Sequence, residues 1–178
     1  MSKTTWVIDP SHSEVTFKVK HLMITNVTGK FGTFSGTATT DGDDFSTVSA
    51  EFSAQIDSIT TNDVQRDGHL QSGDFFDAAA FPELKFITKS VSKADSDGEF
   101  QINGDLTITG ITKNVNLNGE FGGIGKDPWG NIKAGISVNG KINREDFGLT
   151  WNAALETGGV LVSQEVKISC EIQLLKQN

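Results

Sequence analysis

The chain has 178 residues, a formal net charge of −8, 19 glycines and 12 phenylalanines, but no tyrosine. This length suits a single domain over residues 1–178, and it can bury a core that needs neither disulfides nor metal. The charge argues against nucleic-acid binding and gives no basis for electrostatic attachment to anionic lipid, because no run of basic residues is present.

Residues 14–21 predict the first long strand, because apolar and polar side chains alternate there. Thr16, Lys18 and Lys20 belong to the outer face of this strand. The opposite row consists of Val15, Phe17, Val19 and His21. An apolar row that ends in a titratable histidine is expected where an apolar cavity meets its mouth.

The next strands follow after a turn-rich stretch. The pattern predicts a strand within residues 30–40, an acidic turn at 41–44, and a strictly alternating strand over 48–56. These segments alternate between small or apolar residues and polar ones, as half-buried strands do.

The alternation breaks at residues 60–80, where we expect a short helical insert. Asn62 is the predicted N-cap, with Gln65 at the capping-box position. Arg66, His69 and Leu70 would then share one side of the helix. Residues 73–82, which contain Phe75 and Phe76, predict an apolar loop or a second short helix that ends at Pro82.

Strand patterns resume at residues 84–91 and continue through 100–108, 115–121, 132–138 and about 160–175. Together these segments predict roughly eight long strands and one short N-terminal strand. The fold class is therefore all-β with one short helical insert, and the strand spacings fit one barrel or one sandwich; eight antiparallel strands can close a barrel. Such a barrel holds either packed side chains or one small ligand.

Several small residues fall on the inward rows of these strands. They either relieve crowding where the strands bend, or leave room for an elongated apolar cavity, and composition does not decide between the two. They are Gly36, Ala38, Ala50, Ala54, Gly104, Gly119 and Ala134.

The polar residues give little support for metal binding or catalysis. The three histidines lack the spacing of a metal site, and no GxSxG elbow or recognisable Ser–His–Asp arrangement is present. We expect Asp9 and His12 to fix the turn after Pro10, and His21 and His69 to lie at the mouth of a cavity. Cys170 falls on an inward row, which predicts a buried apolar role.

For both arginines, Arg66 and Arg144, a structural role is the first interpretation. Arg66 and Asp67 predict an ion pair or a helix-cap network, although their position beside His69 and the two phenylalanines also fits a segment that covers a pocket. Arg144 begins a segment, residues 144–149, that predicts a polar turn between strands.

The chain resembles the YceI-like family in several passages, which are specific in combination. They are IDPSHSEVTFKVKHL (8–22), GKFGTFSG (29–36), RDGHLQSGDFFD (66–77), FPELKF (81–86), GDLTITGITKNV (104–115) and REDFGL (144–149). The resemblance implies a lipocalin-like, extended eight-stranded antiparallel β-barrel that holds a polyisoprenoid or another long amphiphile in an internal tunnel. From the polar residues we expect no cofactor, no metal and no catalysis. The resemblance also raises a homodimer as a candidate assembly.

Many members of that family are periplasmic and carry a cleaved leader. The segment MSKTTWVIDP lacks the apolar stretch of a secretory signal, and no window has the length of an integral membrane segment. We therefore expect a cytoplasmic protein, or a periplasmic one if a leader was removed.

The expected partner is a long-chain isoprenoid, an isoprenoid quinone or a fatty-acid derivative, held for storage, transport or sequestration. The ligand-binding residues that we predict are Phe17, Val19, His21, Phe52, Arg66, His69, Phe75, Phe76, Ile102, Leu106, Ile108, Val115 and Leu117. Two alternatives remain: an enzyme for a hydrophobic substrate with His21 and His69 as acid–base groups, and a non-catalytic stress-related interaction protein.

Overall fold

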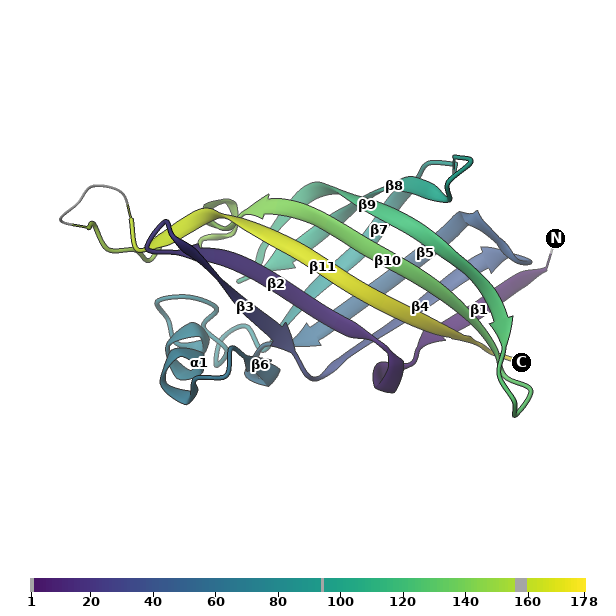
Figure 1. Ribbon diagram of the computed structural model, residues 1–178, viewed down its shortest axis with the longest axis horizontal. Coiled ribbons are helices and arrows are strands. Elements are labelled where there is room, and N and C mark those ends of the chain that lie inside the picture. The colour runs from purple at the N-terminus through teal and green to yellow at the C-terminus, as the bar shows by residue number, and fades with distance from the viewer. Residues whose placement is uncertain (1, 94, 156–159) are drawn as a thin grey trace.

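The computed structural model describes residues 2–93, 95–155 and 160–178, which form one continuous antiparallel sheet with a short helix at one end (Figure 1). The strands are β1 (Lys3–Ile8), β2 (Glu14–His21), β3 (Thr25–Phe31), β4 (Phe34–Asp41), β5 (Asp44–Gln55), β6 (Ile59–Thr60), β7 (Glu83–Val91), β8 (Glu99–Ile108), β9 (Ile111–Lys126), β10 (Ile132–Asn143) and β11 (Val162–Lys176). The helices are α1 (Val64–Gln71) and three 3₁₀ turns, η1 (Pro10–His12), η2 (Ile56–Ser58) and η3 (Arg144–Phe147).

The sheet closes into an eight-stranded barrel through its last strand. Strand β11 pairs with β10 along one edge, and on the other edge it pairs with β2 and then with β1. Strand β1 pairs in turn with β4, which completes the ring β1–β4–β5–β7–β8–β9–β10–β11. This closure pairs both edges of each of the eight ring strands, and it confirms the predicted fold class.

The hairpin of β2 and β3 extends the barrel wall beyond this ring. On its far side β3 pairs only with the two-residue strand β6. Helix α1 and residues 72–82 follow β6 and lie at this end of the molecule, whereas both chain termini lie at the opposite end (Figure 1). The two ends of the barrel are therefore built differently.

An aromatic cluster fills the end near the termini. The Trp6 ring is fully buried and lies 5.0 Å from the Phe45 ring, which stacks on Phe121 at 4.9 Å. The Trp6 indole N–H donates to the buried hydroxyl of Thr40 at 2.9 Å, so its one polar atom is satisfied. This packing closes the interior on that side.

Two local predictions were wrong. The stretch before residue 30 contains strand β3, which alternation alone did not reveal because only Val27 and Phe31 are large on its inner face, which also carries Thr25 and Gly29. The helix cap is Asp63, whose carboxylate accepts from the backbone N–H of Arg66 at 3.1 Å. Asn62 instead has a φ of +64°, and thus makes the turn that precedes the cap.

Candidate ligand-binding tunnel

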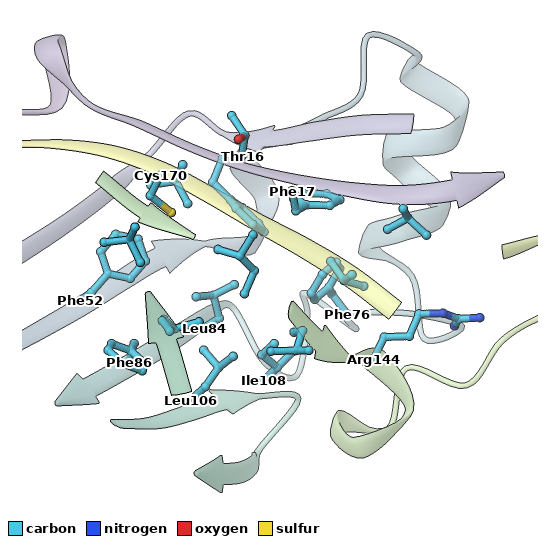
Figure 2. A pocket seen from close by; sticks show the side chains of 18 of the residues that line it. Thr16, Phe17, Phe52, Phe76, Leu84, Phe86, Leu106, Ile108, Arg144 and Cys170 are labelled. Carbon is cyan, nitrogen blue, oxygen red and sulfur yellow. The ribbon is translucent and has the colours of Figure 1, made fainter. Parts of the chain in front are cut away.

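A cavity of about 420 Å³ lies inside the barrel and is lined by the inward rows of its strands. Figure 2 shows Leu84, Phe86, Leu106 and Ile108 pointing from β7 and β8 into the same space that Phe17 and Cys170 face from β2 and β11. This volume falls within the range of small-molecule sites, which are concave and mostly apolar. We call this cavity the tunnel.

Of the thirteen predicted ligand-binding residues, the structure brings twelve to the tunnel. They are Phe17, Val19, His21, Phe52, Arg66, His69, Phe75, Phe76, Ile102, Leu106, Ile108 and Leu117. Val115 is the exception, since it packs in the core but does not line the tunnel. Its partner in the ladder is Gly104, and the Phe86 ring that lies over Gly104 lines the tunnel at this point instead.

The inward glycines receive aromatic rings from neighbouring strands. A Cβ placed on Gly29, Gly104 or Gly119 would lie 2.2, 2.4 or 2.5 Å from the ring of Phe17, Phe86 or Phe100. A ring that occupies the space above a glycine lies along the wall rather than across the lumen. These glycines thus relieve crowding, whereas Ala38 and Ala50, which are paired on β4 and β5, line the open space directly.

The end of the tunnel next to α1, lined by His21, Arg66, His69, Trp151 and Leu161, is called the mouth. Arg66 donates from Nε to the Thr61 hydroxyl at 2.8 Å and from Nη2 to the Thr61 carbonyl at 2.8 Å. The Thr61 hydroxyl donates in turn to Asp67 at 2.6 Å. Arg66 and Asp67 therefore both bind Thr61, which is the cap network of the first interpretation, and they fix α1 across the mouth.

His69 occupies an aromatic corner at the mouth. Its ring meets Trp151 at 4.7 Å and Phe75 at 5.0 Å, both edge to face, and its Nε2 lies 2.9 Å from Asp74 Oδ2. Phe75 and Trp151 are themselves 5.4 Å apart. His69 thus joins the segment after α1 to the segment after η3, and the sequence did not reveal Trp151 as its neighbour because 82 residues separate them.

The turn expected from Arg144 onward is present as η3, but Arg144 itself is buried rather than part of its polar surface. Its side chain is only 3% exposed and donates to the carbonyls of Ser163 (2.8 Å), Leu149 (2.5 Å) and Val162 (3.3 Å). Burial lowers the pKa of the guanidinium below its usual value, and Glu145 opposes this shift. Figure 2 shows the guanidinium pointing away from the apolar side chains, so Arg144 ties η3 to the start of β11.

Cys170 faces the tunnel from the inward row of β11, as its parity predicted. Desolvation raises the pKa of this thiol to about 11, with a smaller contribution from Glu171, while a backbone hydrogen bond from Thr16 opposes the shift. A thiol that holds its proton at neutral pH is a poor nucleophile.

The turn at the start of the chain has the expected structure. Asp9 caps η1 by accepting from the backbone N–H of Ser11 at 3.1 Å, and its other carboxylate oxygen lies 2.8 Å from His12 Nδ1 and 3.1 Å from Lys133 Nζ. Hydrogen bonds from Ser11, His12 and Lys133 hold the pKa of Asp9 well below its usual range, although burial opposes them.

The described residues contain no cluster of metal ligands and no helix suited to crossing a membrane. Over residues 2–93, 95–155 and 160–178, no three His, Cys, Asp or Glu side chains gather as a metal site would require. Among the helices of the same ranges, none combines the length and the hydropathy needed to cross a membrane.

Comparison with known sequences places these features in a family. The model of the YceI-like domain matches residues 6–174. A UPF0312 protein of Staphylococcus aureus (strain MSSA476) is 42% identical over 171 residues, which cover 96% of each chain.

Solved structures share the barrel. The YceI protein of Campylobacter jejuni is 33% identical, with a TM-score of 0.77 over 90% of this chain and 91% of that one. BcnA of Burkholderia cenocepacia (TM-score 0.79, 21% identity, 93% and 98% coverage) has the same fold. So has a polyisoprenoid-binding domain of Saccharophagus degradans (TM-score 0.70, 14% identity, 97% and 98% coverage).

Proposed function

The chain belongs to the YceI-like domain family, and from this premise we propose that it binds a long-chain amphiphile, with its apolar chain inside the barrel. The ligand class is a polyisoprenoid, an isoprenoid quinone or a fatty-acid derivative, and the role is transport, storage or sequestration. The observation that supports this most directly is the tunnel itself, a cavity of about 420 Å³ with an almost wholly apolar lining.

Apolar burial supplies the affinity in this proposal. Each methylene group that leaves water contributes about 0.8 kcal/mol, so a chain of several isoprene units binds without any hydrogen bond. The rings of Phe17, Phe86 and Phe100 form flat parts of the wall, since each lies over a glycine. Such a wall recognises the length and thickness of a chain rather than a pattern of polar groups.

The proposed role involves no chemistry. Three polar side chains in this region have structural partners: Arg66 binds Thr61, Arg144 binds backbone carbonyls, and His69 lies against Asp74. A catalytic acid or base would need a free polar atom directed at the substrate. The name of the Saccharophagus degradans domain, whose fold this chain shares, also supports a binding function.

Extraction of the purified protein tests this function. We expect that denaturation in organic solvent releases a hydrophobic molecule that mass spectrometry detects, and that the emptied protein binds all-trans-retinol, an isoprenoid alcohol that fluoresces when it leaves water. An extract without any such molecule, together with no retinol binding, would contradict the proposal.

A further inference from the structure

The turn between β2 and β3 exposes three consecutive apolar side chains. Leu22, Met23 and Ile24 are 40%, 51% and 75% exposed. Single exposed apolar residues are common on protein surfaces, but a contiguous group marks a site of interaction. These three residues form what we call the apolar tip.

The backbone of the apolar tip is unfavourable for the residues that occupy it. The Ile24 N–H donates to the His21 carbonyl at 3.0 Å, and the two central residues of this turn, Leu22 and Met23, have φ values of +54° and +60°. A hairpin turn with two positive φ values favours Asn-Gly, and bulky apolar residues rarely adopt it. Local backbone preference therefore does not explain why Leu22 and Met23 occupy this turn, whereas an interaction of their exposed side chains does.

The hairpin that presents the apolar tip is basic, although the chain as a whole is acidic. Residues 15–40 include Lys18, Lys20 and Lys30 but neither Asp nor Glu. Lys18 lies opposite Lys167 on β11, which lies opposite Lys141 on β10. The carboxylate of Glu165 lies 3.7 Å from Lys141. Like charges in register repel one another, so this face is suited to an anionic partner.

The apolar tip lies at the tunnel mouth. Its first residue, Leu22, donates its N–H to the carbonyl of Leu161 at 2.9 Å, and both Leu161 and the adjacent His21 line the tunnel. Figure 1 shows this hairpin turn projecting at the end of the barrel opposite the chain termini. A partner that holds the apolar tip would therefore sit directly at the opening through which an apolar ligand passes.

We propose that the apolar tip inserts into the interfacial layer of an anionic lipid bilayer, with Lys18 and Lys20 against the head groups. Apolar side chains flanked by lysines match such a surface, where acyl chains lie beneath negative charge. The net charge of −8 and the carboxylates of residues 63–77 at the same end of the barrel weaken the attraction to anionic lipid, so the proposed docking depends on the three apolar side chains together with the lysines beside them. Docking would serve to exchange ligand with the membrane, and this purpose rests on the proposed function. The docking itself does not depend on that function.

Vesicle flotation tests the proposal, with vesicles of phosphatidylcholine alone or with about a quarter phosphatidylglycerol. We expect the protein to float with the anionic vesicles, and the Leu22→Asn/Met23→Gly variant to lose about tenfold or more of this binding. Because Asn-Gly suits the turn, the variant should unfold at the same temperature as the wild type or higher, which excludes misfolding as the cause. Ile124→Asn, which removes an exposed apolar side chain elsewhere on β9, should leave flotation unchanged.

Three results would overturn this inference. The first is an absence of flotation with anionic vesicles at low salt, and the second is equal flotation of the wild type and the double variant. The third is that neither protein binds vesicles, while ultracentrifugation shows that the wild type self-associates and the double variant does not. The last result would assign the apolar tip to a second copy of the chain. Retinol binding in solution, measured on the same proteins, separates this question from the proposed function, because the apolar tip lies outside the tunnel lining.

Discussion

The ring of Phe100 lies over Gly119, its direct partner on the neighbouring strand, so closely that a Cβ on Gly119 would be 2.5 Å from the ring. Gly119→Ala therefore forces the ring off the wall and into the lumen. We expect a loss of about 1–3 kcal/mol in the free energy of unfolding and weaker retinol binding. Gly125→Ala on the same strand is the matched control, because its Cβ would meet no atom within 4 Å. Equal effects of the two substitutions in urea denaturation would contradict this account.

Filling the lumen should abolish ligand binding without unfolding the barrel. Ala50 lines the tunnel, whereas its neighbour Ser49 is exposed on the outer face of the same strand. Ala50→Phe occupies the space of the ligand chain, and we expect a loss of retinol affinity of about tenfold or more. Ser49→Phe adds the same ring outside. If both variants bind retinol as the wild type does, the ligand does not occupy this part of the tunnel.

The two arginines of the chain should contribute very differently to stability. Arg144→Met takes the guanidinium donor from the buried Leu149 carbonyl and from the partly buried Ser163 carbonyl, whereas the Val162 carbonyl still accepts from the Asn152 amide, and we expect a loss of about 3 kcal/mol in the free energy of unfolding. Arg66 is exposed and its guanidinium donates to Thr61, so Arg66→Met should cost about 1 kcal/mol or less. Urea denaturation of both variants gives the comparison. A larger loss for Arg66→Met would show that the cap network, rather than η3, limits stability.

Asp9 should stabilise the fold in a pH-dependent manner. Its pKa is depressed in the folded protein, so its contribution is complete above the carboxyl pKa of the unfolded chain, about 4, and decreases as the pH falls toward the folded value. We expect Asp9→Asn to lower the free energy of unfolding by about 1–2 kcal/mol at pH 7. This difference should shrink below about pH 4. A difference that is constant from pH 7 to about pH 2 would exclude the carboxylate charge as its source.

Cys170 provides a reporter of the tunnel that needs no engineering. Since its thiol pKa is about 11, its reaction with N-ethylmaleimide at pH 8 should be slower than that of an unfolded cysteine by a factor on the order of one hundred. Retinol in the tunnel should slow it further, and guanidinium should remove the protection. A rate that is unaffected by retinol would place the ligand away from β11.

The inward rows were predictable from the chain alone because they depend only on strand parity. Alternation placed Phe17, Phe52 and Leu106 on the inner face, and all three line the tunnel. The number of strands allowed a barrel or a sandwich, and the family resemblance implied the barrel. Strand parity did not predict every lining residue. Val115 has the inward parity, but the Phe86 ring over Gly104 lines the tunnel at this point instead.

The tertiary structure decided what the inward residues do. The small inward residues could either relieve crowding or leave room for a cavity. Aromatic rings pack on Gly104 and Gly119, which therefore relieve crowding, whereas Ala38 and Ala50 line open space. The partners of Arg144 and His69 were likewise hidden, because burial and the approach of Trp151 depend on how η3 and β11 meet. The sequence by itself determined which face of each strand is apolar, since side-chain direction is local. Whether those faces enclose a cavity depends on contacts between distant strands, which only the closed barrel defines.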